Sequence, residues 1–307
     1  MKNDTFYSNG KLLISGEYLV LDGALSLAIP TKYGQSLVVE VIGQPHIIWN
    51  SLDEVGNCWF EDKFSIEQMA LSMPPRNDIS KRLFQILNTA KQLNSDFLNT
   101  NNGFKITTSL SFSKNWGLGT SSTLINNIAN WANVDAYTLL EKTFGGSGYD
   151  IACAQHNSPI YYHLENGKPI VEIVEFNPSF KEHLYFVYLN KKQNSREGIS
   201  KYKEHRKHIE SSIFNINKIT TQMVSCKSLE DFESLIIQHE RIISNLIKLK
   251  PIKEVLFNDF YGQIKSLGAW GGDFVMATCK TDPKPYFNGK GFDTVIPYND
   301  MVLKNNP

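Results

Sequence analysis

A glycine-rich loop between two periodic segments constrains the fold more than any other feature. Before the loop, apolar residues alternate with polar ones from Phe104 to Phe112, which predicts a strand. After the loop, apolar residues recur at helical spacing as far as Trp131. The loop contains Gly117 and Gly119 and leads into three hydroxyl residues, Thr120, Ser121 and Ser122. A strand, a glycine loop and a helix therefore follow one another directly.

This succession is typical of an anion-binding site. The start of a helix leaves backbone N–H groups unsatisfied, and the positive end of the helix dipole lies at the same place, so phosphate is the expected ligand. An ordinary helix N-cap explains the same residues, and a short motif by itself favours that simpler interpretation. The loop also lacks the lysine of the Walker A motif and the last glycine of the dinucleotide-binding fingerprint.

The loop resembles the second signature motif of the GHMP kinases, the superfamily of galactokinase, homoserine kinase, mevalonate kinase and phosphomevalonate kinase. Residues 10–18, GKLLISGEY, resemble its first motif, and residues 265–273, KSLGAWGGD, resemble its third. Residues 147–150, SGYD, match the S-G-x-D stretch of the mevalonate and phosphomevalonate kinases. Three motifs in the family's order span most of the chain, and their details are most similar to phosphomevalonate kinase, with mevalonate kinase close behind.

The resemblance implies transfer of the ATP γ-phosphoryl group to phosphomevalonate or mevalonate. Asp150 would orient or deprotonate the acceptor hydroxyl, and Lys11 would hold Asp150 ionised and stabilise developing negative charge. Ser121 would coordinate Mg²⁺ together with Glu141, whose spacing to Asp150 is shorter than the family's. The loop would hold the phosphates of ATP through Gly117, Leu118, Gly119, Thr120, Ser121 and Ser122. The acceptor would contact Glu17, Tyr18, Ser147, Gly268 and Ala269.

Several of these residues also have simpler interpretations. Lys11 and Glu17 beside apolar strand residues suit a solvated sheet edge. Asp150 suits a helix N-cap. Trp270 replaces a glycine of the third motif and would narrow the substrate pocket. The stretch before Asp150 is not a nucleophile elbow, because Tyr149 stands where the last glycine is needed.

Two further functions stay open: another GHMP kinase with a sugar or homoserine acceptor, and a non-catalytic homologue that senses a ligand.

Composition restricts the partners. The chain has 31 Lys and Arg against 31 Asp and Glu, and this balance argues against a general nucleic-acid or membrane-surface binder. No apolar run approaches the roughly 20 residues of a membrane span, so we expect a soluble, cytoplasmic protein. The partner that we expect is a small molecule, and the expected oligomeric state is a monomer or homodimer. His156 and His163 have no partners at metal-ligand spacing and are interpreted as structural. The four cysteines are scattered, which predicts buried, reduced thiols.

The periodicity predicts a mixed α and β protein, and the resemblance implies the two-domain α+β fold of the GHMP kinases. In that fold an N-terminal domain like domain 2 of ribosomal protein S5 precedes a ferredoxin-like domain, and we place them at residues 1–178 and 179–307. Asp78 is the predicted N-cap of a helix that continues to Leu93. The Asn166-Gly167 pair predicts a hairpin turn. Further helices are predicted over 135–144, 197–224, 229–249 and 252–267, a strand over 274–278, and an edge strand with a surface segment over 295–303.

Overall fold

The protein is described by a computed structural model over residues 3–66, 77–193 and 195–304. It has an α+β fold with two sheets. The chain forms two compact units that are discontinuous in sequence. Unit 1 contains Met1–Gly10, Tyr33–Lys114 and Leu118–Gln155, and unit 2 contains Lys11–Lys32, Asn115–Gly117 and His156–Pro307. The division at residue 178 stays a prediction.

The larger sheet has seven strands in the order β4-β3-β5-β2-β6-β7, with β1 also paired to β2. Strands β3 and β5 are parallel, whereas β2 pairs antiparallel with β5 and β6. The strands are β1 (Asp4–Leu13), β2 (Ser26–Ile42), β3 (His46–Leu52), β4 (Cys58–Ser65), β5 (Gly103–Leu110), β6 (Ile160–Glu165) and β7 (Lys168–Ile173).

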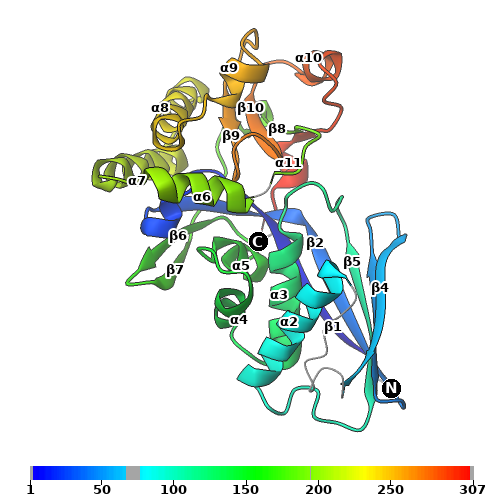
Figure 1. Cartoon of the computed structure of the whole chain (residues 1–307). Helices are drawn as coiled ribbons and strands as arrows, with labels where there is room; N and C mark the ends of the chain where they lie inside the picture. The colour runs from blue at the N-terminus through cyan, green and yellow to red at the C-terminus, as the bar shows by residue number, and fades with distance from the viewer. Residues whose placement is uncertain (1–2, 67–76, 194, 305–307) are drawn as a thin grey trace. The chain divides into compact units, whose positions relative to one another are not determined.

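In unit 1, four helices contribute to a core against the sheet (Figure 1). Successive side chains of a strand point to opposite faces, and in β3 this alternation buries Ile47 and Trp49 while their neighbours stay partly exposed. These two side chains pack in one cluster with Leu87 of α2 and Ile125 of α3. The helices are α2 (Asp78–Leu93), α3 (Thr120–Ala132), α4 (Ala136–Thr143) and α5 (Tyr149–Gln155).

Unit 2 contains a second, four-stranded antiparallel sheet in the order β11-β8-β10-β9. Its strands are β8 (Leu184–Tyr188), β9 (Ile264–Ser266), β10 (Phe274–Thr278) and β11 (Val295–Pro297). Short 3-10 helices lie at η1 (Leu19–Asp22) and η2 (Lys181–His183). The α-helices are α6 (Ser195–His205), α7 (Glu210–Ser225), α8 (Leu229–Ile247), α9 (Ile252–Leu256), α10 (Lys284–Gly289) and α11 (Tyr298–Met301).

The strongest local patterns are confirmed. Strand β5 leads into the glycine loop, and α3 begins directly after it. The β6–β7 hairpin turns at Asn166 and Gly167, which have φ of 50° and 75°, as a type I′ turn requires. Strand β10 spans the predicted residues 274–278. One detail of α2 was wrong: Asn77 is the N-cap and accepts a hydrogen bond from the Ser80 N–H at 2.9 Å, so Asp78 is the first helical residue.

Three predictions in the C-terminal half were wrong. The helix predicted over 197–224 is divided into α6 and α7, and His208 between them has a φ of 55°. The helix predicted over 252–267 ends at Leu256, and residues 264–266 form β9 instead. Gly262 lies so close to Thr278 that a Cβ atom on it would meet the Thr278 carbonyl oxygen at 1.7 Å. Pairing with β10 therefore determines that residues 264–266 are extended rather than helical. The tail forms an edge strand, but Tyr298 and Met301 are buried rather than on the surface.

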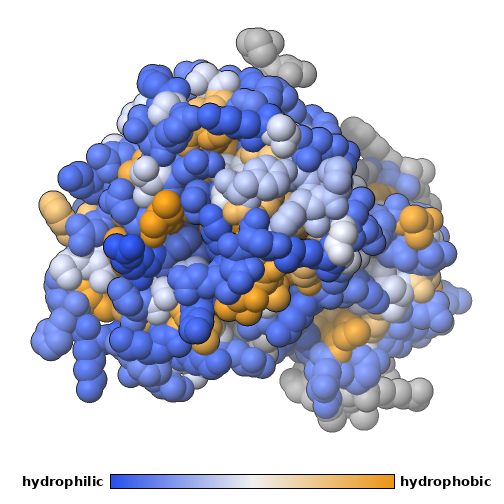
Figure 2. All heavy atoms as spheres, turned by 90° about the horizontal axis from the view of Figure 1, so that it is seen from above, coloured by the Kyte–Doolittle hydropathy of each residue, from blue (hydrophilic) through white to orange (hydrophobic). Residues whose placement is uncertain are grey.

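The surface drawn in Figure 2 is mostly hydrophilic, with several separate hydrophobic areas. All four cysteines are free. Cys153 and Cys279 are buried as predicted, but Cys58 is exposed and Cys226 is partly exposed, so the prediction was wrong for these two. No helix in the described part of the chain is long and apolar enough to cross a membrane.

Candidate functional site

The start of α3 suits an anion. Gly119 is its N-cap, with a φ of 101°, and a glycine offers no side chain to the N–H groups of the first turn. The Ser122 hydroxyl donates back to the Gly119 carbonyl at 2.9 Å, whereas Ser121 is exposed. A helix start of this kind suits a phosphate, and the role of Ser121 as a metal ligand stays a prediction.

A buried polar network holds α3 in unit 1. Asn127 accepts a hydrogen bond from the Ser8 hydroxyl of β1 at 2.7 Å and donates to the Gln35 carbonyl of β2 at 2.9 Å. The Thr123 hydroxyl donates to the Gln35 side chain at 2.8 Å. Asn126 donates to Ser8 at 2.9 Å. This network fixes the helix start that follows the loop, and the helical pattern gave no sign of it.

In unit 2, the first-motif lysine contacts the glycine loop. The Lys11 ammonium donates to the Gly117 carbonyl at 2.8 Å. Gly117 has a φ of 67°, and a Cβ atom there would lie 2.3 Å from the carboxyl carbon of Asp273. The Asp273 carboxylate accepts from the Gln193 N–H at 3.1 Å. Burial raises the pKa of Asp273, and Gln193, Lys11 and Lys192 partly offset that rise. The Lys11 ammonium therefore bonds to the loop backbone at Gly117, and the Asp273 side chain packs closely against this glycine.

Glu17 lies in a buried charge cluster, so its interpretation as a solvated edge residue was wrong. Its side chain is 1% exposed and bonds to the Lys265 ammonium of β9. His239 of α8 lies 3.0 Å from the same carboxylate, and Glu240 lies 3.3 Å from Lys265. Burial tends to raise the pKa of Glu17, but Lys265 and His239 hold it below its ordinary value. Burial raises the pKa of Glu240 to about 7 and lowers that of His239.

Tyr18 links the first motif to the third within unit 2. Its backbone has a φ of 63°, and its hydroxyl accepts a hydrogen bond from the Trp270 backbone N–H at 3.1 Å. Its ring stacks on Tyr202 of α6, with centroids 5.8 Å apart. Gly268 also has a positive φ of 62°, and Ala269 is buried. Unit 2 therefore brings together Lys11, Glu17, Tyr18, Gly117 and the third-motif loop.

The other predicted residues lie in unit 1. Asp150 belongs to the first turn of α5, which begins at Tyr149, so it is not the N-cap ahead of Ile151. One of its carboxylate oxygens accepts from the Ile151 N–H at 3.1 Å. Ser147 is half-buried just before this helix, and Glu141 is exposed on α4. Within residues 3–66, 77–193 and 195–304, no three His, Cys, Asp or Glu side chains form a metal-binding group.

The sequence patterns did not predict four contributors: Asp273, Lys265, His239 and Glu240. The first two belong to the third motif, whose glycines rather than its charges carry the resemblance. Lys265 is a charged residue in a mostly apolar stretch, between Ile264 and Leu267. A lysine in such a place is typical of a buried ion pair with a carboxylate. Glu240 gives no such sign, because it lies within a long amphipathic helix.

Comparison with known structures identifies the fold. No protein-family model and no curated protein sequence matches the chain. Mevalonate kinase from Methanococcus jannaschii superposes with a TM-score of 0.73 at 17% identity, over 99% of both chains. Phosphomevalonate kinase from Streptococcus pneumoniae, solved with phosphomevalonate and AMPPNP, gives 0.66 at 15% identity over 98% of both chains. Galactokinase from Lactococcus lactis, solved with galactose, gives 0.68 at 12% identity, over 94% of this chain and 88% of that one.

Proposed function

From the GHMP kinase fold of this chain, we propose that it is an ATP-dependent small-molecule kinase. The observation that carries the proposal is the hydrogen bond from Lys11 to the Gly117 carbonyl, which places the first-motif lysine on the glycine loop. Phosphoryl transfer needs positioning and positive charge more than covalent chemistry by the protein. A lysine fixed beside a phosphate-binding loop supplies both.

The loop and the start of α3 would hold ATP. The backbone N–H groups from Gly117 to Ser122 would bind its phosphates. The Ser121 hydroxyl, which is exposed, would be a ligand of Mg²⁺, with Glu141 as the proposed carboxylate. The bound magnesium ion supplies positive charge that offsets the charge of the β- and γ-phosphates.

Asp150 would accept the proton of the acceptor hydroxyl. One of its oxygens accepts from the Ile151 N–H, which holds the carboxylate at the start of α5, where it would meet the acceptor hydroxyl. Lys11 would keep Asp150 ionised and stabilise negative charge that develops during transfer. Glu17 is buried against Lys265 and His239, so it would act by fixing the first-motif turn, and its direct contact with the acceptor stays a prediction.

The acceptor we propose is phosphomevalonate or mevalonate, because the S-G-Y-D stretch and the Gly271-Gly272-Asp273 ending of the third motif are most like those kinases. A sugar or homoserine acceptor is the second candidate. Trp270 keeps this candidate open, because the bulky residue replaces a glycine of the third motif and so departs from the family's pattern near the acceptor. A non-catalytic sensor is disfavoured by the presence of Lys11, Ser121 and Asp150.

The test is ADP release from Mg-ATP with mevalonate, phosphomevalonate, galactose or homoserine as acceptor. The same assay on an Asp150→Asn preparation controls for contaminating kinases. Turnover with one mevalonate compound that is lost in the variant would support the proposal and decide the acceptor. ATP binding without turnover on any acceptor would favour the sensor.

A further inference from the structure

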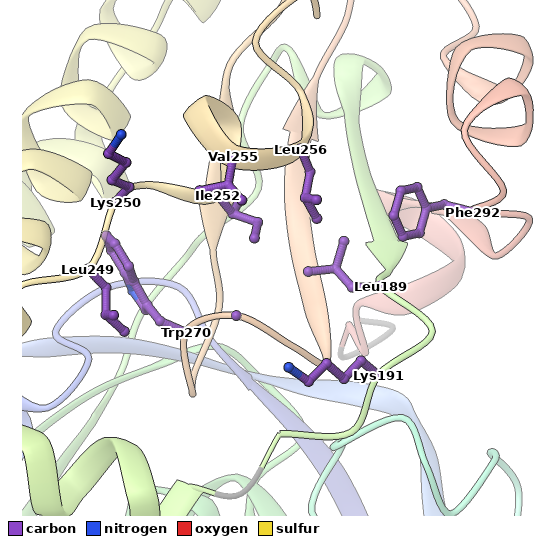
Figure 3. Close-up of a pocket in the computed structure, with 10 residues that line it drawn as sticks. Leu189, Lys191, Leu249, Lys250, Ile252, Val255, Leu256, Trp270 and Phe292 are labelled. Carbon is purple, nitrogen blue, oxygen red and sulfur yellow. The ribbon is translucent and has the colours of Figure 1, made fainter.

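An apolar pocket of about 510 Å³ lies within unit 2 (Figure 3). Its volume falls in the range of small-molecule sites, roughly 300–1,000 Å³. Its wall is formed by helix α9, by the segments that follow β8, α8 and α10, and by Trp270 and Gly271 of the third motif. The apolar lining is Leu189, Leu249, Ile252, Val255, Leu256 and Phe292.

Part of this lining is left to water. Val255 is 58% exposed, Leu256 37% and Leu249 36%. Apolar area gains roughly 25 cal/mol for each Å² that is removed from water, so an apolar chain in the pocket would be stabilised by covering these side chains. Larger exposed apolar patches mark interaction sites or ligand-binding grooves.

The polar groups of the pocket are donors. Trp270 is 3% exposed, and its indole N–H has no acceptor among the described residues. A buried donor without a partner is costly, so an acceptor brought by a ligand would relieve that cost. In Figure 3 the Lys191 ammonium is directed toward the side of the pocket formed by Trp270, whereas the Lys250 ammonium is directed away from it. Tryptophan and lysine side chains donate hydrogen bonds and accept none.

We infer that this pocket binds an amphipathic anion, a molecule with an unbranched apolar chain that ends in a carboxylate or phosphate group. The chain would lie against the apolar wall of α9. The anionic oxygens would accept hydrogen bonds from the Trp270 indole and the Lys191 ammonium. A neutral lipid would leave Lys191 unpaired, and a cation would be repelled by it. Trp270 and Gly271 of the third motif also line the pocket, but its apolar wall comes from α9 and from the residues after α8 and α10, which belong to none of the three motifs. Binding of an apolar chain here therefore goes beyond the proposed kinase function.

The experiment is isothermal titration calorimetry of the full chain, without nucleotide, with decanoate, decyl phosphate and decanol. We expect both anions to bind with one-to-one stoichiometry and more tightly than decanol. Lys191→Met should weaken both anions about tenfold and leave decanol unchanged, because it removes a charge-assisted hydrogen bond but keeps an apolar side chain. Lys250→Met is the matched control and should change neither. Trp270→Phe should weaken the anions while it keeps an aromatic wall.

Three results would overturn the inference. If decanol binds as tightly as decanoate, the anionic group does not contribute to binding. Equal losses in the Lys191 and Lys250 variants would show general attraction to positive charge. No one-to-one binding of either anion would leave the pocket without this ligand class. The tighter of the two anions identifies whether the head is a carboxylate or a phosphate. None of these measurements uses ATP, so the result is independent of kinase activity.

Discussion

The cluster around Glu17 illustrates how burial changes the role of a charged residue. A charge that leaves water is expensive unless it is paired, and the removal of one partner of a buried pair typically costs about 3–5 kcal/mol. Here Lys265 lies between Glu17 and Glu240, so one ammonium group offsets two carboxyl groups. The Ser266 hydroxyl also donates to Glu240 at 2.9 Å. The first-motif turn, β9 and α8 are thereby fixed to one another within unit 2.

Asp150→Asn should reduce kcat by about 100-fold or more, because proton transfer by a positioned base contributes 10²–10⁴-fold. ATP affinity should be nearly unchanged. The asparagine keeps an oxygen that can accept from the Ile151 N–H, so the start of α5 is retained. Steady-state kinetics with titration of an unreactive ATP analogue separates the two quantities. Equal losses of rate and affinity would contradict the proposed role of Asp150.

Glu240→Gln should change how stability depends on pH. The folded-state pKa of Glu240 is about 7 against an ordinary 4.5, so its contribution to stability is fully present below 4.5 and is lost as pH rises through about 7. The glutamine does not titrate and still offers an acceptor to Ser266. The unfolding free energy of the variant minus that of the wild type should therefore increase by about 3 kcal/mol as the pH rises from roughly 4.5 to 8.

Urea unfolding of the two proteins across this pH range measures the difference. Glu17 and His239 titrate in both proteins, so their contributions largely cancel. A difference that does not change with pH would mean that Glu240 is ionised throughout and that its pKa is not raised.

The glycine loop and α3 form the element on which the proposed chemistry depends. A strand delivers the chain to the loop, and the buried contacts of Ser8, Gln35 and Asn127 hold the helix that follows. At Gly117 the Lys11 ammonium bonds to the backbone carbonyl, and the Asp273 side chain packs closely against the glycine. The loop is thus fixed at both ends, which is the arrangement that positioning of a phosphate requires.

Gly117→Ala and Gly145→Ala separate backbone strain from a steric clash. The two glycines have nearly equal φ, 67° and 68°, so an alanine should cost about 1 kcal/mol of stability at either position. The Cβ atom at Gly117 would meet Asp273, whereas the one at Gly145 would meet nothing within 4 Å. Only Gly117→Ala should therefore displace the loop and lower kcat/KM for ATP, by about 100-fold.

Urea unfolding and kinetics on both variants check this expectation. If both variants lose the same amount of activity, strain alone explains the loss and the contact with Asp273 has no role. If Gly117→Ala keeps full activity, the loop does not require a fixed position at this residue.

At the scale of the whole molecule, the chain passes repeatedly between its two units. Strand β2 begins in unit 2 and continues into unit 1, and β1 likewise contributes residues to both. Each unit still has its own hydrophobic core, one around Trp49 and Leu87 and the other around Phe257 and Ile264. Because β2 pairs with β5 in one unit and with β6 in the other, both units share this strand, and we expect them to unfold together.

Leu87→Ala and Ile264→Ala test this cooperativity. Each should lower the unfolding free energy by about 2–5 kcal/mol, because each removes a buried side chain from a different core. Both variants should nevertheless unfold in one transition, measured by circular dichroism and tryptophan fluorescence. Two transitions, with only one of them shifted by each variant, would show that the units unfold independently.

Features that depend on neighbours along the chain could be predicted from the amino-acid sequence. These are the strand, loop and helix around Gly117, the Asn166-Gly167 turn and strand β10, because periodicity and turn chemistry act over a few residues. The remaining features depend on contacts between distant segments. Glu17 meets Lys265 across 248 positions of sequence, and β9 is a strand only because β10 pairs with it. Such pairs leave no local pattern, since the energy that fixes them arises from burial and pairing between segments far apart in the sequence.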